Sequence, residues 1–504
     1  MLIAIDRSKP TPLYLQIKKE IRELILSRTL PAGFCLPPER KLAETLGVNR
    51  TTVVNAYNEL KADGLIGGQV GRGTMVLPQS PGTAEPHQPP AALQWRQFFN
   101  EASFKGRDPL LRDLMELVSH KDVISFAAGI PDPGDYPLAA LAEIQQEMML
   151  NHGADLLVHT PVEGHYPLRE SICGLMESRG IHAAPEETLI LSGSQQGLNL
   201  IARAFLKPGD VVLVEEPSFF CAIQVFQAAG ARVFGVPTDE RGMITGALEP
   251  LLDRHQPKLI YTLPTFQNPS GAVMGLERRL HLLDLAYHYQ IPIVEDDPYY
   301  EMRYEGEAVP PLKALDRYGY VLYLSTFSKL FFPGARIGWV AAPRPVIRQF
   351  TWEKQNVDLH SNNLGQWLFD GLLRRDFLPG HIRRVTANYR NRRDQLVAAL
   401  ERHAPPAVEW NHPSGGFYLW CRLPFAIDSS RLLATAVRQR VAFVPGTPFS
   451  TEGMGRNYLR LNFTFPAQEQ LEPGVKRLAR AIRDTLREAE ELPGDPEVAV
   501  RPII

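Results

Sequence analysis

The chain has few cysteines and no long apolar segment. Its four cysteines, Cys35, Cys173, Cys221 and Cys421, are far apart and form no paired spacing in a sequence of 504 residues. This pattern favours reduced thiols in a cytoplasmic protein, and we expect no metal centre. No apolar run approaches the length needed to span a bilayer. The start, MLIAIDRSKP, has only a short apolar run and lacks the layout of a signal peptide.

Charge is distributed unevenly along the chain. A length of 504 residues exceeds what one hydrophobic core usually serves, so two or more domains are expected. Residues 1–78 carry 11 Lys and Arg against 7 Asp and Glu, whereas the remainder carries 43 against 49. A mildly basic module on an acidic body favours contact between that module and a polyanion.

A proline-rich stretch separates the two parts. LPQSPGTAEPHQPPA has no periodic apolar pattern and is typical of an extended linker. Beyond it, short apolar runs such as DVVLVEEP, KLIYTLP and IPIVEDD alternate with amphipathic stretches, which predicts a mostly parallel α/β sheet covered by helices. We therefore predict a mainly α-helical N-terminal domain (1–78), a linker (79–108) and a large α/β domain (109–490).

The N-terminal module has the order of a helix-turn-helix. PLYLQIKKEIRELILSRTL predicts an amphipathic helix. In LPPERKLAETLGVNRTTVVNAYNELKADGLI, Pro37 and Pro38 open a short helix, Gly47 allows a tight turn, and Asn49 caps a longer helix ending near Gly64. The second helix of such a pair can enter the major groove of DNA.

Polar residues cluster where that second helix would begin. Two β-like runs then surround a glycine-rich tip in GLIGGQVGRGTMV, as in a wing. Side chains suited to phosphates and base edges are Arg40, Asn49, Arg50, Thr51, Thr52 and Arg72. A small helical bundle with a solvated polar face is the alternative. The combined order resembles the winged helix-turn-helix of the GntR family, which implies binding to a double-stranded DNA operator.

In the large domain, Lys329 lies in a strand-like apolar run, YLSTFSKLFFPGARIGWV. A lysine that forms a Schiff base with pyridoxal 5'-phosphate must be partly desolvated so that its amine is neutral. The cofactor also needs a phosphate site and a partner for its pyridine nitrogen. Candidates for the phosphate are Ser194 and Gln195 at a predicted helix start, together with Thr326, Ser328 and Arg336.

Two further motifs supply cofactor contacts. Asn268 of TLPTFQNPSGAVM could donate to the cofactor's phenolic oxygen. In IPIVEDDPYYE a strand ends in two carboxylates, Asp296 and Asp297, and only one can serve the pyridine nitrogen because neighbours on a strand point to opposite faces.

From about residue 110 to 490 this order resembles the aspartate-aminotransferase superfamily, PLP fold type I, class I/II branch. The resemblance implies a large α/β domain with a smaller C-terminal α+β subdomain and a Schiff base on Lys329. It assigns the pyridine nitrogen to Asp296, the phenolic oxygen to Tyr299 and ring stacking to Phe219. It places an amino compound near Gly129 and its α-carboxylate at Arg460.

Two positions depart from the family pattern and bear on catalytic rate. His159 stands where the family often has a tyrosine that reaches the neighbouring subunit's phosphate. Phe219 stands where a tyrosine often stacks on the ring, and it cannot donate a hydrogen bond.

Together the two halves resemble the MocR subfamily of GntR-type transcriptional regulators. That layout implies a homodimeric regulator that senses an amino compound or PLP through its aminotransferase-like domain. Two alternatives stay open: a working aminotransferase that acts on an amino acid, with the N-terminal module as a tether, and a regulator whose only effector is PLP. Residual transaminase activity is compatible with regulation.

Overall fold

The computed structural model describes residues 3, 5–7, 11–69, 73–78, 93–99, 122–375 and 377–491. The chain divides into two compact units, Met1–Phe98 and Phe99–Ile504. Most of the predicted linker, 79–108, lies outside the described residues. No helix in the described ranges has both the length and the apolar character of a membrane span.

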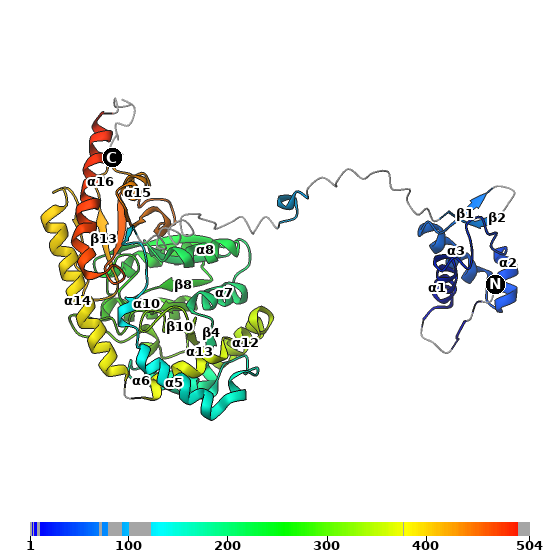
Figure 1. The fold of residues 1–504 in the computed structure, drawn as a ribbon, viewed down its shortest axis with the longest axis horizontal. Coiled ribbons are helices and arrows are strands. Elements are labelled where there is room, and N and C mark those ends of the chain that lie inside the picture. The colour runs from blue at the N-terminus through cyan, green and yellow to red at the C-terminus, as the bar shows by residue number, and fades with distance from the viewer. Residues whose placement is uncertain are drawn as a thin grey trace. The chain divides into compact units, whose positions relative to one another are not determined.

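The first unit packs three helices against a two-stranded hairpin (Figure 1). Its helices are α1 (Leu13–Leu26), α2 (Glu39–Leu46) and α3 (Arg50–Ala62), and the antiparallel strands are β1 (Ile66–Gln69) and β2 (Gly73–Val76). Helix α1 buries one stripe, Ile17, Ile21 and Ile25, at the spacing of an amphipathic helix. The predicted order of helices and paired strands is confirmed.

Local residue chemistry sets the ends of the helix pair. Helix α2 ends at Gly47, whose φ of 63° lies in the left-handed region that glycine adopts without strain. Asn49 then caps α3, because its side chain accepts a hydrogen bond from the Thr51 backbone N–H at 3.1 Å. Both predictions, the turn at Gly47 and the cap at Asn49, are confirmed.

The second unit is built on an eight-stranded sheet with the order β4-β11-β10-β9-β8-β5-β6-β7. The pairs β5–β6, β5–β8, β8–β9 and β9–β10 are parallel, and β11 and β7 join antiparallel. The predicted mostly parallel sheet is therefore confirmed. The strands are β4 (Thr188–Leu191), β5 (Val211–Glu216), β6 (Arg232–Asp239), β7 (Gly242–Met243), β8 (Leu259–Thr262), β9 (Ile293–Asp296), β10 (Val321–Thr326) and β11 (Gly338–Ala341).

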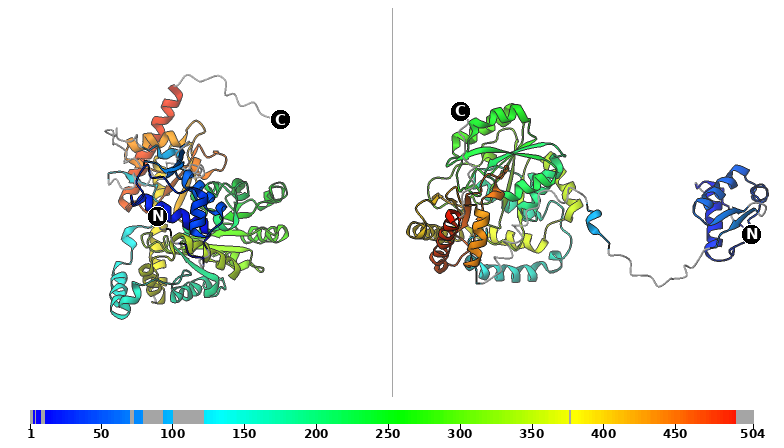
Figure 2. Two further views of the ribbon diagram at one scale, coloured as in Figure 1. Left: turned by 90° about the vertical axis from the view of Figure 1, so that its right-hand side faces the viewer. Right: turned by 90° about the horizontal axis from the view of Figure 1, so that it is seen from above.

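Helices cover both faces of this sheet (Figures 1 and 2). Val212 and Val214 of β5 pack in one apolar cluster with α7, α8 and α12, while Val211 and Leu213 pack in another with α9 and α10. Alternate residues of one buried strand thus serve both cores, which is why these strands are almost continuously apolar. The helices are α7 (Ser194–Phe205), α8 (Phe220–Ala228), α9 (Leu248–His255), α10 (Leu276–Tyr289), α11 (Leu312–Leu315) and α12 (Arg344–Asp358).

A smaller α+β part completes the unit. Its four-stranded antiparallel sheet has the order β12-β13-β16-β15, with β12 (Glu409–Trp410), β13 (Tyr418–Arg422), β15 (Val444–Pro445) and β16 (Tyr458–Asn462). A parallel pair of β3 (Ile124–Ser125) and β14 (Val441–Ala442) ties the start of the described unit to this part. The remaining helices are α5 (Leu138–His152), α6 (Tyr166–Glu177), α13 (Asn363–Arg374), α14 (Leu378–His403), α15 (Ser429–Arg438) and α16 (Leu471–Glu491).

Candidate functional site

A cavity of about 360 Å³ lies in the large unit, at the carboxyl ends of the parallel strands and against the smaller α+β part. Crevices at this edge are the usual ligand sites of open α/β sheets. The twelve site residues predicted for this unit all line the cavity: Gly129, Ser194, Gln195, Phe219, Asn268, Asp296, Tyr299, Thr326, Ser328, Lys329, Arg336 and Arg460. They come from segments far apart in the sequence, so the fold itself assembles the set.

Lys329 follows strand β10 and faces the cavity. Its Nζ donates a hydrogen bond to the backbone carbonyl of Gly129. Desolvation lowers the pKa of the ammonium, Tyr418 opposes this shift, and the charges of Arg460 and Arg336 lower the pKa further. A lowered pKa enlarges the fraction of neutral amine, the form that attacks a carbonyl carbon.

Asp296 is the last residue of β9, and its carboxyl group is buried in the cavity wall. Oδ2 accepts a hydrogen bond from Tyr261 Oη at 2.8 Å, while Oδ1 has no hydrogen-bond partner among the described residues. Burial raises the pKa of this carboxyl to about 7, against the lowering effect of the Tyr261 hydrogen bond. An unpaired oxygen in a buried carboxyl group fits a protonated ring nitrogen as its missing partner.

The neighbouring Asp297 does not line the cavity. Its Oδ2 accepts a hydrogen bond from Tyr323 Oη at 2.9 Å, and burial raises its pKa to about 6. The alternation of side chains along the strand end therefore places Asp296, and not Asp297, at the cavity.

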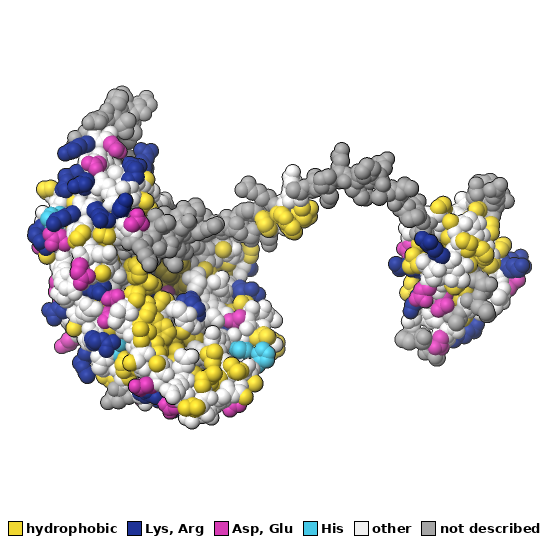
Figure 3. Space-filling model, viewed as in Figure 1, with side chains coloured by type: hydrophobic (Ala, Val, Ile, Leu, Met, Phe, Trp, Pro, Cys, Tyr) yellow, Lys and Arg dark blue, Asp and Glu magenta, His cyan; other side chains and the backbone are white. Residues whose placement is uncertain are grey.

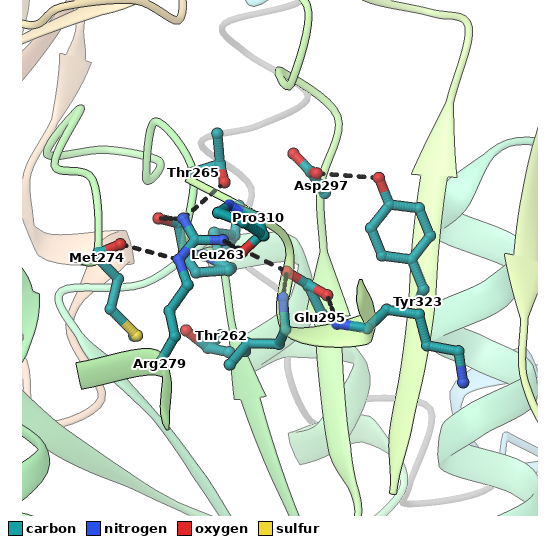
Figure 4. Close-up of polar contacts among 12 residues, drawn as sticks. Thr262, Leu263, Thr265, Met274, Arg279, Glu295, Asp297, Pro310 and Tyr323 are labelled. Atoms are coloured by element: carbon teal, nitrogen blue, oxygen red, sulfur yellow. Dashed lines mark hydrogen bonds and ion pairs between the residues drawn. The ribbon is translucent and has the colours of Figure 1, made fainter. Parts of the chain in front are cut away.

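A buried polar network supports this end of β9 (Figure 4). Glu295 accepts hydrogen bonds from the backbone N–H groups of Leu312 and Lys313, both at 2.8 Å. Arg279 lies 3.9 Å from Glu295 and donates to the carbonyls of Met274 and Pro264. These contacts tie the start of α11 to Glu295, which directly precedes Asp296 in the sequence, and the segment after β8 to Arg279.

The turn between β4 and α7 forms one end of the cavity. Gly193 has a φ of 84°, and a Cβ there would collide with the guanidinium of Arg336. Only glycine allows Arg336 to approach the first turn of α7, where Ser194 begins the helix. Unpaired N–H groups of a helix start and an arginine together make an anion site. Thr326 and Ser328 lie beside it, joined by a hydrogen bond of 3.0 Å.

Arg460, on β16, lies at the opposite end. Its Nη1 donates to Asn268 Oδ1 at 2.8 Å, and its guanidinium lies 4.0 Å from the centre of the Tyr418 ring. The Nε atom has no partner among the described residues. Arg460 is only 4% exposed, and it lines the cavity.

The structure adds cavity residues that the sequence did not indicate. Tyr418 Oη accepts a hydrogen bond from Tyr299 Oη at 3.0 Å and fills the space beside Gly129. The Cys221 thiol, near the start of α8, also lines the cavity, and burial raises its pKa to about 12. Tyr261 supports Asp296 from β8. A tyrosine within a buried strand needs a hydrogen-bond partner, which is the one signal that could have pointed to Tyr261.

His159, the first departure from the family pattern, is exposed and does not line the cavity of its own chain. Its Nδ1 lies 2.9 Å from Nε2 of His360, which follows α12. Phe219, the second departure, lines the cavity at the residue before α8.

In the first unit the predicted DNA contacts gather at the start of α3. Arg50 and Thr51 are exposed there, Thr52 is half-buried, and Asn49 is the exposed cap. Arg40 is the second residue of α2, exposed and 3.3 Å from Glu44. Arg72 lies outside the described residues.

Comparisons with known proteins match both units. The family "Aminotransferase class I and II" matches residues 121–478, and "Bacterial regulatory proteins, gntR family" matches residues 13–76. The chain is 33% identical to the uncharacterized HTH-type transcriptional regulator YisV of Bacillus subtilis, over 95% of this chain and 97% of that one. It is 30% identical to the probable rhizopine catabolism regulatory protein MocR of Rhizobium meliloti, over 88% of each.

A solved structure matches the large unit. Crystalline LysN, the α-aminoadipate aminotransferase of Thermus thermophilus in complex with N-(5'-phosphopyridoxyl)-L-leucine, superposes with a TM-score of 0.74 at 35% identity. The match covers 79% of this chain and all of LysN.

Proposed function

This chain belongs to the class I and II aminotransferase family and carries a GntR-family DNA-binding region, and we propose that it is a transcriptional regulator controlled by an amino compound. The observation that carries the proposal is the pairing, in one chain, of a DNA-reading helix start with a cavity that retains every predicted cofactor residue. Three relatives that align with this chain over 97% to 99% of their own length are named as HTH-type transcriptional regulators.

The cofactor is pyridoxal 5'-phosphate, which supplies an aldehyde for amines and a ring that withdraws electrons. We propose that Lys329 provides the amine that holds the aldehyde, and that the unpaired Oδ1 of Asp296 pairs with the pyridine nitrogen. Phe219 would lie along the ring, with Asn268 and Tyr299 beside its phenolic oxygen.

We propose that the phosphate of PLP binds at the start of α7. Ser194 and Gln195 offer the first helical N–H groups, and Thr326, Ser328 and Arg336 complete the anion site.

The effector is an amino compound that enters beside Gly129 and Lys329. Arg460 would bind its carboxylate, because the guanidinium is buried against Tyr418 at the cavity, and its Nε–H has no partner among the described residues. Binding changes the affinity for DNA only to the extent that the two conformations of the large unit bind the effector with different affinities.

The first unit would read an operator in double-stranded DNA. Arg50, Thr51 and Thr52 are proposed for base and phosphate contacts, with Arg40 and Asn49 at the backbone and Arg72 in the wing. We place the protein in the cytoplasm, where a bacterial regulator meets its DNA.

We further propose a homodimer. Figure 3 shows hydrophobic side chains on the surface of the large unit. Leu157, Val158 and Leu359 are more than half exposed and adjoin His159 and His360 in the sequence. A second copy of the chain would bury this apolar surface and would present two DNA-binding modules to two half-sites.

An active aminotransferase is the second candidate, because Lys329, Asp296 and Arg460 meet in one cavity. One experiment separates the two. The purified protein is mixed with PLP and each member of an amino-acid panel, and operator affinity and keto-acid production are measured in parallel. A change in DNA affinity without turnover supports the regulator. Sustained keto-acid production with unchanged DNA affinity would contradict it.

A further inference from the structure

Behind the turn between β4 and α7 lies a network of polar side chains. Asp358, the last residue of α12, accepts hydrogen bonds at Oδ2 from Ser192 Oγ at 2.9 Å and from Gln196 Nε2 at 2.7 Å. Gln196 Oε1 in turn accepts from the Ser192 backbone N–H at 2.8 Å. Ser192 directly precedes Gly193 and Ser194, and Gln196 follows them in the first turn of α7. Asp358 therefore binds a residue on each side of the proposed anion site.

A buried lysine completes the network. Lys354 has a side-chain exposure of 0%, and its Nζ donates to Asp358 Oδ1 at 2.7 Å. The same Nζ lies 3.3 Å from Gln196 Oε1. Desolvation lowers the pKa of Lys354, and the hydrogen bond to Asp358 opposes this shift. A buried lysine is costly unless it is paired, so this cation fixes the position of Asp358.

The segment after Asp358 holds the carboxylate in place. Leu359 has a φ of 61° and a ψ of −58°, a conformation that a bulky side chain rarely adopts, and the His360 N–H donates to the Asp358 carbonyl at 2.7 Å, which makes a tight turn at the end of α12. Ser361 then lies 3.2 Å from Ser192 through their hydroxyl oxygens. The strained turn therefore returns to the same serine that Asp358 binds.

We propose that Lys354 and Asp358 are positioning residues for the cofactor's phosphate. Neither residue lines the cavity. They act through Ser192 and Gln196, which hold Gly193 and the first N–H groups of α7 in the orientation that receives an anion. At metal sites, loss of a hydrogen bond that orients a binding group lowers affinity by about 10-fold or more, and we expect a similar scale for this turn. The inference rests on the proposed use of this turn for the phosphate of PLP.

The proposal predicts a selective defect. Lys354→Met leaves Asp358 without its cation. Asp358→Asn removes the negative charge and replaces one of the two acceptor oxygens by an NH2 donor, so the contacts to Lys354 and to Ser192 and Gln196 cannot all be kept. Each variant should weaken PLP binding by about 10-fold. Binding of pyridoxal, which has the ring and aldehyde but no phosphate, should change little in either variant, because Lys329, Asp296 and Phe219 are untouched.

The chain offers a matched control in Lys313. This lysine is also largely buried, donates to the Val321 carbonyl at 2.9 Å, lies 4.0 Å from Asp316, and is not part of the cavity wall. Lys313→Met removes the same ammonium group from the same unit but keeps the backbone N–H that binds Glu295, so it should leave the affinities for PLP and pyridoxal both unchanged. Thermal unfolding of each apoprotein shows whether a variant is folded.

The experiment titrates the full-length protein and the three variants with PLP and with pyridoxal, and follows the visible absorbance. A loss of PLP affinity alone in Lys354→Met and Asp358→Asn supports the inference. Equal losses for both ligands, or no loss in a folded variant, would overturn it. If the unmodified protein shows no preference for PLP over pyridoxal, the assignment of the phosphate site fails instead.

Discussion

At the scale of single residues, the site depends on burying groups that water would otherwise stabilise. Desolvation lowers the pKa of Lys329 and raises that of Asp296 to about 7, so both lie nearer neutrality than they would in water. Neither shift stabilises the fold at neutral pH, because each disfavours the charged form. On the proposed assignment, a neutral Lys329 amine can react with the aldehyde of PLP, and a protonated ring nitrogen beside Asp296 would favour the carboxylate form that burial alone disfavours.

Replacing Lys329 by alanine tests the lysine assignment. The variant cannot hold the aldehyde covalently, and Lys354 and Lys313 lie outside the cavity and cannot substitute. We expect the visible absorbance band of bound PLP to disappear, while far-UV circular dichroism stays unchanged. A visible band that survives in the folded variant would assign the covalent contact to another residue.

Asp296 should make the apoprotein sensitive to pH. The folded pKa of about 7 exceeds the ordinary value of 3.8, so the folded chain keeps a proton that the unfolded chain releases. This contribution to the free energy of unfolding is fully present below pH 3.8 and is lost as the pH rises through about 7.

Asp296→Asn should therefore flatten the dependence of stability on pH between these two values. Denaturant unfolding of the apoprotein across that range measures the effect. The neighbours Glu295 and Asp297 also have raised pKa values, so a residual slope should remain in the variant. An unchanged slope would mean that Asp296 is already ionised in the folded apoprotein.

At the scale of elements, the start of helix α3 holds both a structural cap, Asn49, and a residue that we propose for DNA recognition, Arg50. The cap at Asn49 satisfies the Thr51 N–H, and Arg50 is exposed one residue later. Arg50 lies 3.8 Å from Glu39, a loose surface pair that contributes little to stability. Substitution of Asn49 should therefore lower stability, whereas substitution of Arg50 should weaken DNA binding.

Arg50→Ala should weaken operator binding and leave stability and PLP absorbance unchanged. Loss of one base contact costs about 1–3 kcal/mol of binding free energy, and the sequence preference at that base should relax. Fluorescence anisotropy with a selected operator and single-base variants measures both. Equal affinity and unaltered preference would remove Arg50 from the recognition surface.

Asn49→Ala is the companion variant. Removing the cap should lower the free energy of unfolding of the first unit by about 1 kcal/mol. Thermal unfolding of the full-length protein, followed by a probe in that unit, measures the loss. An unchanged free energy of unfolding would mean that the hydrogen bond between Asn49 and the Thr51 N–H does not stabilise the unit.

The extent of prediction from sequence also differs between elements. Local rules govern the helix starts, the turn at Gly47, the strand end at Asp296 and the segment after β10 that holds Lys329, so the order of residues was sufficient. Tyr418 and the pair of Lys354 and Asp358 were not foreseen. Their importance comes from contacts with Tyr299 and Ser192, more than 100 residues away, and no local pattern indicates such contacts.

At the scale of the whole molecule, two compact units serve two kinds of ligand. The first offers an exposed helix start with a net basic sequence, and the second a cavity whose two ends suit a phosphate and a carboxylate. Regulation requires that occupation of the cavity change the affinity for DNA, a coupling that is reciprocal by thermodynamic necessity.

The carboxylate of the effector should be needed for occupation of the cavity to change the affinity for DNA. Arg460→Ala should abolish the response to amino acids and leave any response to amines without a carboxylate intact, because only the former use the guanidinium. Operator affinity measured with an amino acid and with its decarboxylated amine makes the comparison. Equal responses in the variant would place the carboxylate elsewhere.

The most direct test of the account measures operator affinity and the visible spectrum on one sample of the PLP-loaded protein during titration with amino compounds. We predict that one compound shifts both signals with the same midpoint, since one binding event drives both. A compound that changes the spectrum and is turned over to a keto acid while operator affinity stays constant would contradict the account and leave the large unit as an enzyme.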